Sequence, residues 1–146
     1  PSRRALAERM GATVALDPRE RDLADVQREL GMTEGFDVAL EMSGSPEALR
    51  SAISAMAHGG RIAVLGIPTE EIAIDFGPVI FNMLTLRGIY GREMYETWYQ
   101  MSVMLQSGLD ISPVITHRLP YDAFAEAFEI AGSGDAGKVV LDWTTA

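Results

Sequence analysis

Two glycine-flanked segments contain the residues whose types and spacing are best suited to binding a ligand. In the first, two glycines and an arginine at 59–61 lead into an apolar run that ends in Leu65, Gly66 and Ile67. Glycine lets a flat ring or a phosphate approach the backbone closely, but it also forms ordinary tight turns at strand ends. The pattern is therefore consistent either with a ligand contact or with a simple turn.

The second segment covers residues 88–92, where Ile89, Tyr90 and Arg92 stand between and after two glycines. These side chains could belong to a binding site at the end of a strand. They could equally pack at its rim, and most loop aromatics do no more than cover the core. The residue types alone favour packing.

Nothing else in the chain forms a catalytic constellation. The adjacent carboxylates Glu70 and Glu71 are typical of a solvated loop. His58 is expected to cap a helix carboxyl end and His117 to make a structural hydrogen bond. With no cysteine and only these two histidines, far apart in sequence, a metal centre within the chain is not expected. We assign no catalytic and no metal-binding residue.

The elements that would position the two segments alternate between apolar runs and amphipathic stretches, which is the pattern of a parallel α/β sheet. The 61–67 and 84–90 stretches predict strands, and Met94, Trp98 and Met101 predict a core-facing helix. Helices are expected at residues 4–10, 22–30, 46–57, 94–105 and 121–130, and strands at 13–16, 36–42, 61–67, 84–90, 114–119 and 138–143.

Size and charge limit the classes of protein. A chain of 146 residues with 47% hydrophobic residues can bury a real core. Its apolar runs fall far short of the ~20 residues of a membrane span. A net charge of −9 disfavours a nucleic-acid partner, which needs clustered cations. We expect a cytoplasmic protein that acts on a small molecule and has no nucleic-acid or membrane partner.

Several stretches resemble the zinc-dependent medium-chain dehydrogenases. They are GMTEGFDV at 31–38, LEMSG at 40–44, HGGRIAVLGIP at 58–68, GIYGREMYETWY at 88–99, SGLD at 107–110, ITHR at 115–118 and GKVV at 137–140. The glycine-rich strand at 58–68 is general to that family. The 88–99 stretch is more specific, and it is most similar to the L-threonine 3-dehydrogenases.

The resemblance implies an oxidoreductase that oxidises L-threonine to 2-amino-3-oxobutanoate with NAD and zinc. Residues 1–108 would be an incomplete Rossmann-type doubly wound parallel sheet. Residues 109–146 would be a C-terminal segment that returns toward a catalytic domain. The cofactor-binding residues carried over from the family are Arg3 on the adenosine side, Leu65, Gly66 and Ile67 on the nicotinamide side, and the pair Ile89 and Tyr90.

By the same resemblance, the pyrophosphate loop, the first two strands and the zinc ligands would precede Pro1. The chain alone is then expected to bind no zinc and to turn over no threonine. We expect unpaired strand edges that rearrange, that self-associate into a homo-oligomer, or that leave an ordered core starting near Phe36. Another zinc-dependent alcohol or polyol dehydrogenase, or a non-catalytic nucleotide-binding or assembly module, stays open, as does NADP in place of NAD.

Overall fold

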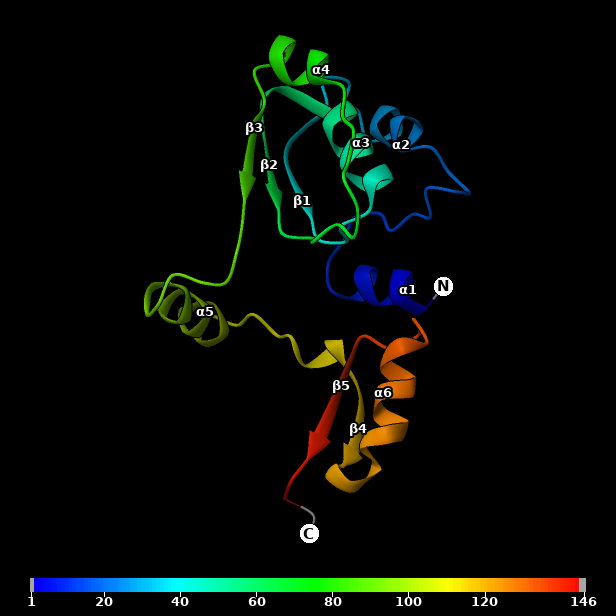
Figure 1. The fold of residues 1–146 in the computed structure, drawn as a ribbon, viewed down its shortest axis with the longest axis vertical. Helices are drawn as coiled ribbons and strands as arrows, with labels where there is room; N and C mark the ends of the chain where they lie inside the picture. Colours follow the sequence, from blue (N-terminus) through cyan, green and yellow to red (C-terminus); the bar gives the residue numbers. More distant parts are fainter. Residues whose placement is uncertain (1, 145–146) are drawn as a thin grey trace. The chain divides into compact units, whose positions relative to one another are not determined.

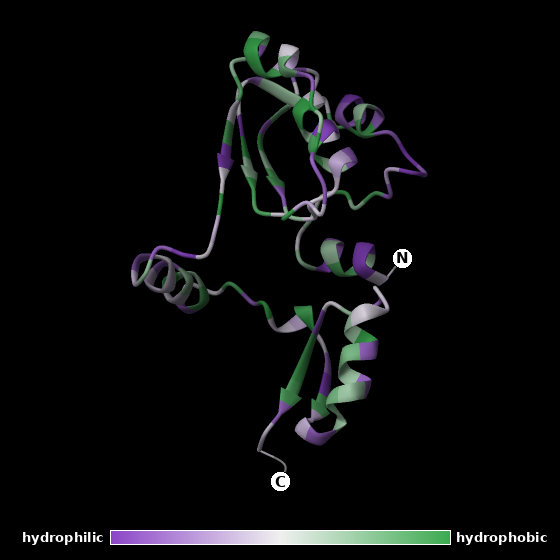
Figure 2. Ribbon diagram, viewed as in Figure 1, coloured by the Kyte–Doolittle hydropathy of each residue, from purple (hydrophilic) through white to green (hydrophobic). Residues whose placement is uncertain are grey.

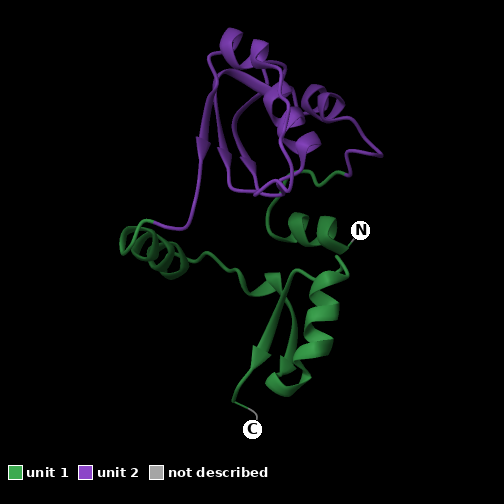
Figure 3. Ribbon diagram, viewed as in Figure 1, with its two compact units in different colours: residues 1–16, 93–146 green, residues 17–92 purple. Residues whose placement is uncertain are grey.

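A computed structural model describes residues 2–144 of the chain. It contains two compact units, one formed by residues 17–92 and the other by residues 1–16 together with 93–146 (Figure 3). Each unit contains its own parallel sheet, with three strands in the first and two in the second. We call them the three-strand unit and the two-strand unit. The predicted α/β class with parallel sheets is confirmed.

The three-strand unit alternates helices and strands along the chain, and its sheet order is β1-β2-β3 (Figure 1). Its elements are α2 (Leu23–Glu29), β1 (Phe36–Glu41), α3 (Pro46–Ser54), β2 (Met56–Val64), α4 (Phe76–Phe81) and β3 (Thr85–Gly88). In the regular part of the ladder Glu41 lies opposite Val64, and Val64 lies opposite Gly88. The three strands therefore end level with one another.

The start of α3 follows directly from its sequence. The Ser45 hydroxyl accepts a hydrogen bond from the Ala48 amide at 3.3 Å, and Pro46 occupies the first turn, where its missing N–H costs nothing. Both features confirm the predicted cap. The cap directs the apolar face of α3 onto the sheet.

The core of this unit lies between α3 and β2. Leu49 and Ile53 of α3 pack with Met56 and Ile62 of β2, and Ile62 is 1% exposed. Ile62 stands on the central strand, where neighbours on both sides exclude water. Burying such a side chain is worth about 1.5–3 kcal/mol.

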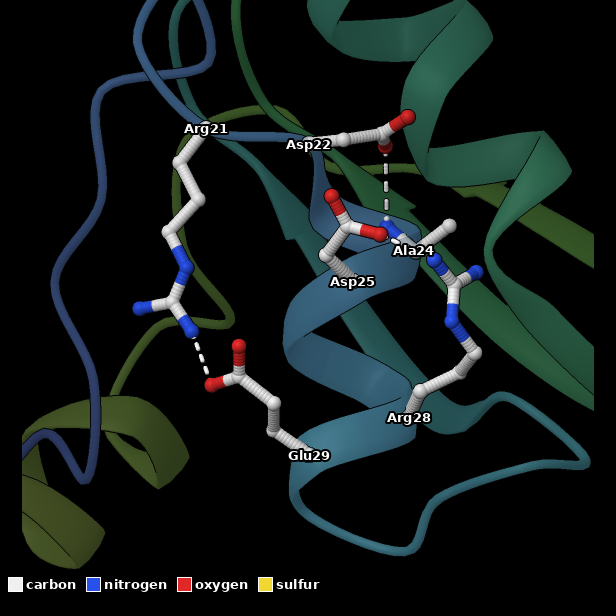
Figure 4. A network of polar contacts seen from close by, with 6 residues as sticks. All are labelled: Arg21, Asp22, Ala24, Asp25, Arg28 and Glu29. Carbon is white, nitrogen blue, oxygen red and sulfur yellow. Dashed lines mark hydrogen bonds and ion pairs between the residues drawn. The ribbon is translucent and has the colours of Figure 1, made fainter.

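The short helix α2 is defined by its ends. The Asp22 carboxylate accepts a hydrogen bond from the Ala24 amide at 2.9 Å, as Figure 4 shows. Gly31, at φ +70°, closes the helix in the left-handed conformation, as its sequence predicts. Arg21 pairs with Glu29 and Arg28 with Asp25 on the exposed surface (Figure 4). Exposed pairs of this kind contribute ~1 kcal/mol at most.

The two-strand unit is built on the parallel pair β4 and β5. Its elements are α1 (Ser2–Arg9), α5 (Glu96–Gln106), the 3₁₀ turns η1 (Ser112–Val114) and η2 (Tyr121–Ala123), β4 (Ile115–Pro120), α6 (Phe124–Gly132) and β5 (Lys138–Asp142). Helix α6 packs on both strands through the buried Ala127. Figure 2 shows hydrophobic residues along β5 beside a more polar β4.

Two expectations, about residues 13–16 and about His58, are wrong. Residues 13–16 form no strand, because no strand in the described part of the chain pairs with them and isolated β-structure is unstable. His58 lies within β2 and caps no helix, since β2 begins at Met56, earlier than the apolar run suggests. The strand includes additional residues before Arg61 because its pairing with β1 is irregular there: Phe36 lies opposite Met56, and Val38 lies opposite Arg61.

Helix α5 differs from its predicted role as a core helix. Residues 96–106 are all described, and they include no buried residue. Trp98 is 49% exposed and Met101 is 48% exposed, so neither is a core residue. The helix therefore has the predicted apolar spacing, but none of its residues is buried.

The predicted domain boundary between residues 108 and 109 stays a prediction.

None of the described helices is both long enough and apolar enough to cross a membrane.

Ile62 and Ile67 provide a matched test of where the core lies. We expect Ile62→Ala to lower the free energy of unfolding by about 2–5 kcal/mol, because truncation leaves a cavity in the centre of the unit. Ile67→Ala, at a position 77% exposed, is expected to change it by less than ~0.5 kcal/mol. Urea unfolding followed by circular dichroism measures both. Equal losses for the two variants would contradict this position of the core.

Candidate functional site

The carboxyl ends of the three parallel strands form one edge of the sheet in the three-strand unit. Residues 42–44, 65–67 and 89–91 follow β1, β2 and β3 in turn. In open α/β sheets ligands bind outside the carboxyl ends of the strands. Both glycine-flanked segments of the sequence therefore belong to the edge of the sheet where a ligand is expected.

Backbone hydrogen bonds hold the loops side by side. The Glu41 carbonyl accepts from the Leu65 amide at 2.8 Å and from the Gly66 amide at 3.1 Å. The Val64 carbonyl accepts from the Ile89 amide at 2.9 Å. These bonds extend the ladder by one residue beyond the strands, so the loops are fixed laterally where they leave the sheet.

The side chains at this edge are apolar and accessible. Ile67 is 77% exposed and Tyr90 is 94% exposed, while Leu65 and Ile89 are exposed to about 40% (41% and 38%). An accessible apolar and aromatic surface of this kind is suited to contact with a planar ring.

Five of the six predicted cofactor residues come together in this way: Leu65, Gly66, Ile67, Ile89 and Tyr90. The sixth, Arg3, belongs to α1 of the two-strand unit. Its Nε donates to the carbonyl of Ala136 at 3.1 Å. Arg3 therefore has a structural partner in that unit, and its role toward the adenosine side stays a prediction.

Close packing explains why position 66 is a glycine. A Cβ atom there would lie 2.0 Å from the Gly44 nitrogen and 2.5 Å from Glu41 Oε2. Gly44 in turn has φ +72°, and a Cβ on it would lie 2.6 Å from the carbonyl oxygen of Ile67. The loops after β1 and β2 touch backbone to backbone, so both glycines are required by packing whatever ligand binds.

Sequence reasoning missed the residue at the centre of this contact. The side chain of Glu41 is buried, at 5% exposure, directly where β1 ends. Its Oε1 accepts hydrogen bonds from the Ser43 amide at 2.7 Å, the Ser43 hydroxyl at 2.5 Å and the Gly44 amide at 3.0 Å. The available signal was a carboxylate inside an apolar strand, followed at once by Ser and Gly.

Those hydrogen bonds set the ionisation of Glu41. The Ser43 hydroxyl contributes most, and together with the Ser43 and Gly44 amides it lowers the pKa of the Glu41 carboxyl below the usual value, against the opposing effect of burial. The buried group is therefore an anion at neutral pH. Its charge is balanced by donors and not by a cation.

A cavity of about 440 Å³ opens beside Glu41, between α3 and the loop that follows β2. Leu49, Val64 and Pro68 supply apolar wall, and the exposed Glu70 and Glu71 stand at the loop. The predicted solvated character of those two carboxylates agrees with their exposure.

No zinc site fits these residues. Within residues 2–144, His, Asp and Glu side chains form no group of three or more that could hold a metal ion.

Comparison with known proteins identifies the fold family. A family profile described as "Zinc-binding dehydrogenase" matches residues 1–107. The chain belongs to the zinc-binding dehydrogenase family. An "L-threonine 3-dehydrogenase" of Solibacter usitatus is 64% identical over 98% of this chain. The match covers 42% of that relative, so this zinc-binding dehydrogenase chain spans less than half the length of the curated protein.

Solved structures give the same architecture. An "alcohol dehydrogenase zinc-binding domain protein" from Burkholderia ambifaria superposes with a TM-score of 0.82 at 30% identity, covering 97% of this chain and 39% of the other. A short chain alcohol dehydrogenase of E. coli CFT073, solved with the cofactor NADH, has a TM-score of 0.83 at 19% identity, over 97% of this chain and 42% of that one. At this identity the second match shows the fold alone.

Gly66 and Gly88 allow a matched test of the loop contact. We expect Gly66→Ala to destabilise the protein by about 1–3 kcal/mol, since its Cβ meets fixed backbone. Gly88→Ala, with no atom within 4 Å of its Cβ, is expected to be near neutral. Thermal unfolding of both variants decides, and a Gly66→Ala protein as stable as Gly88→Ala would refute the close approach.

The lowered pKa of Glu41 predicts a pH-dependent stability. A carboxyl whose pKa is lower in the folded state stabilises above its unfolded value and loses that contribution as pH falls through the folded value. We expect the difference in unfolding free energy between wild type and Glu41→Gln to be constant near neutral pH. It should shrink once the pH drops below about 4.5, the ordinary carboxyl value. Urea titrations at a series of pH values measure it, and a difference that persists unchanged in acid would contradict the assignment.

Proposed function

We propose that this chain forms part of an NAD-dependent L-threonine 3-dehydrogenase and supplies the surface for the nicotinamide half of the cofactor. The observation that carries the proposal is the 64% identity to a protein of that name over 98% of the chain. The accessible edge formed by Leu65, Ile67 and Tyr90 supports the proposal, because this edge provides an apolar surface against which a nicotinamide ring can pack. When bound, NAD supplies the hydride acceptor, and these residues orient the ring and exclude water from one of its faces.

The proposed cofactor is NAD, which the resemblance of the 88–99 stretch to the L-threonine 3-dehydrogenases implies. Zinc would be held by residues other than those described, so we propose that the 146-residue chain by itself binds no catalytic zinc and turns over no threonine. We further propose a cytoplasmic enzyme with L-threonine as its small-molecule substrate.

A homo-oligomer is part of this proposal. Within the described residues β3 pairs with β2 alone, which leaves its other edge without a strand. An unpaired edge is a ready template for a second chain. Size-exclusion chromatography with light scattering tests it, and a monomer at all concentrations would count against it.

The test of the activity is a zinc-loaded assay of the protein that carries this sequence. We expect NADH to form with L-threonine and NAD, and to form far more slowly with butane-2,3-diol or sorbitol. Faster reaction with either of these would favour the rival polyol dehydrogenase. Oxidation of L-threonine by the isolated 146-residue chain would overturn the proposal that this chain alone is inactive.

Tyr90 tests the cofactor surface directly. An aromatic contact is worth ~0.5–1.5 kcal/mol, so Tyr90→Ala is expected to raise the Kd for NADH about two- to tenfold. Phe128→Ala is a matched control, because Phe128 is an aromatic residue that is 74% exposed and belongs to the two-strand unit. Titration calorimetry measures both. An unchanged Kd in Tyr90→Ala would remove Tyr90 from the site.

A further inference from the structure

Glu41 is the one charged side chain that is buried among the described residues, and a role for it follows from what it binds at each end. Its carboxylate accepts from the backbone of Ser43 and Gly44, which follow it. Its carbonyl accepts from the backbone amides of Leu65 and Gly66, which follow the neighbouring strand β2. One residue thus joins the loop after β1 to the loop after β2.

The carboxylate acts on the loop after β1. Gly44 bonds to both oxygens, at 3.0 Å and 3.2 Å, and the Ser43 hydroxyl completes the set. Several charge-assisted bonds to one anion fix a three-residue turn more firmly than neutral bonds would. Ser43 Oγ in turn accepts from the Ser45 amide at 3.1 Å, which connects the turn to the cap of α3.

The turn, once fixed, presses on the loop that is proposed to bind cofactor. Gly44 is so close to residues 66 and 67 that no Cβ fits on either Gly44 or Gly66. Any shift of the turn would therefore move Gly66 or the Ile67 carbonyl. Because interiors at this density transmit displacement, the position of residues 65–67 depends on the Glu41 anion.

We propose that Glu41 is a positioning residue for the nicotinamide half of the cofactor. It touches neither substrate nor cofactor. It holds the turn at 42–44 against residues 65–67, and so fixes the backbone over which the nicotinamide ring lies. This inference rests on the proposed function, since it presumes that residues 65–67 contact the cofactor.

The test compares two probes that differ by the nicotinamide. NADH contains it and ADP-ribose does not, so a positioning defect confined to residues 65–67 affects NADH alone. We expect Glu41→Gln, which is nearly isosteric, to raise the Kd for NADH about tenfold and to leave that for ADP-ribose within twofold. Ser43→Ala removes one hydrogen-bond donor to Glu41, so it should raise the Kd for NADH about two- to threefold. This second variant keeps the test usable if Glu41→Gln folds poorly.

Glu126→Gln is the control. Glu126 is an exposed carboxylate in the first turn of α6, in the two-strand unit, so this variant removes the same charge outside the unit that contains the turn. Its Kd for NADH should equal that of wild type. Equal weakening of NADH and ADP-ribose by Glu41→Gln would indicate a general structural defect and overturn the proposal, as would an unchanged Kd for NADH.

Amide hydrogen exchange separates failure of this inference from failure of the proposed function. In Glu41→Gln the amides of Ser43, Gly44 and Gly66 should exchange at least tenfold faster, with Ile62 in the core unchanged. If wild type binds no NADH, the proposed function and the nicotinamide role both fall, yet faster exchange still shows that Glu41 holds the two loops. Exchange rates equal to wild type would show that it does not.

Discussion

The structure of the three-strand unit depends on the burial of one face of β2 beneath α3. Ile62, on the central strand, meets Leu49 and Ile53 of the helix, and residues of β1, α4 and β3 pack against the same cluster. A parallel strand with partners on both edges cannot slip by one residue without exposing its core face to water. The register that brings Glu41, Val64 and Gly88 level is a consequence of that burial.

Because the strands end level, their loops meet, and the properties of the site are those of three adjoining loops. The backbone contact between Gly44 and Gly66 brings two of them together, and the bond from the Ile89 amide to the Val64 carbonyl adds the third. Side chains that would otherwise cover the loops are excluded by the glycines. An accessible apolar edge follows, with Ile67 and Tyr90 projecting from it. Binding of a planar ring is the use that such an edge favours.

The exposed helix α5 shows the opposite situation. Its apolar residues have helical spacing, but none of those described is buried. Spacing reports which residues share a face of a helix, whereas burial requires a second surface to cover that face. The same reasoning applies to residues 13–16, whose composition suits a strand but which have no partner strand in the described part of the chain.

The sequence by itself determined the α/β class, the Ser45–Pro46 cap, the strands near 36–41 and 85–88, and the two glycine-flanked segments, because these depend on local periodicity and turn chemistry. Its motifs also pointed to the dehydrogenase family that the comparisons then showed. Tertiary structure alone decided that Gly66 is required by the nearness of Gly44, that Arg3 bonds to Ala136, and that Glu41 is buried and joins two loops. Each of these is a contact between residues distant in sequence, or a burial that such contacts create, and no local pattern encodes where the second partner will lie.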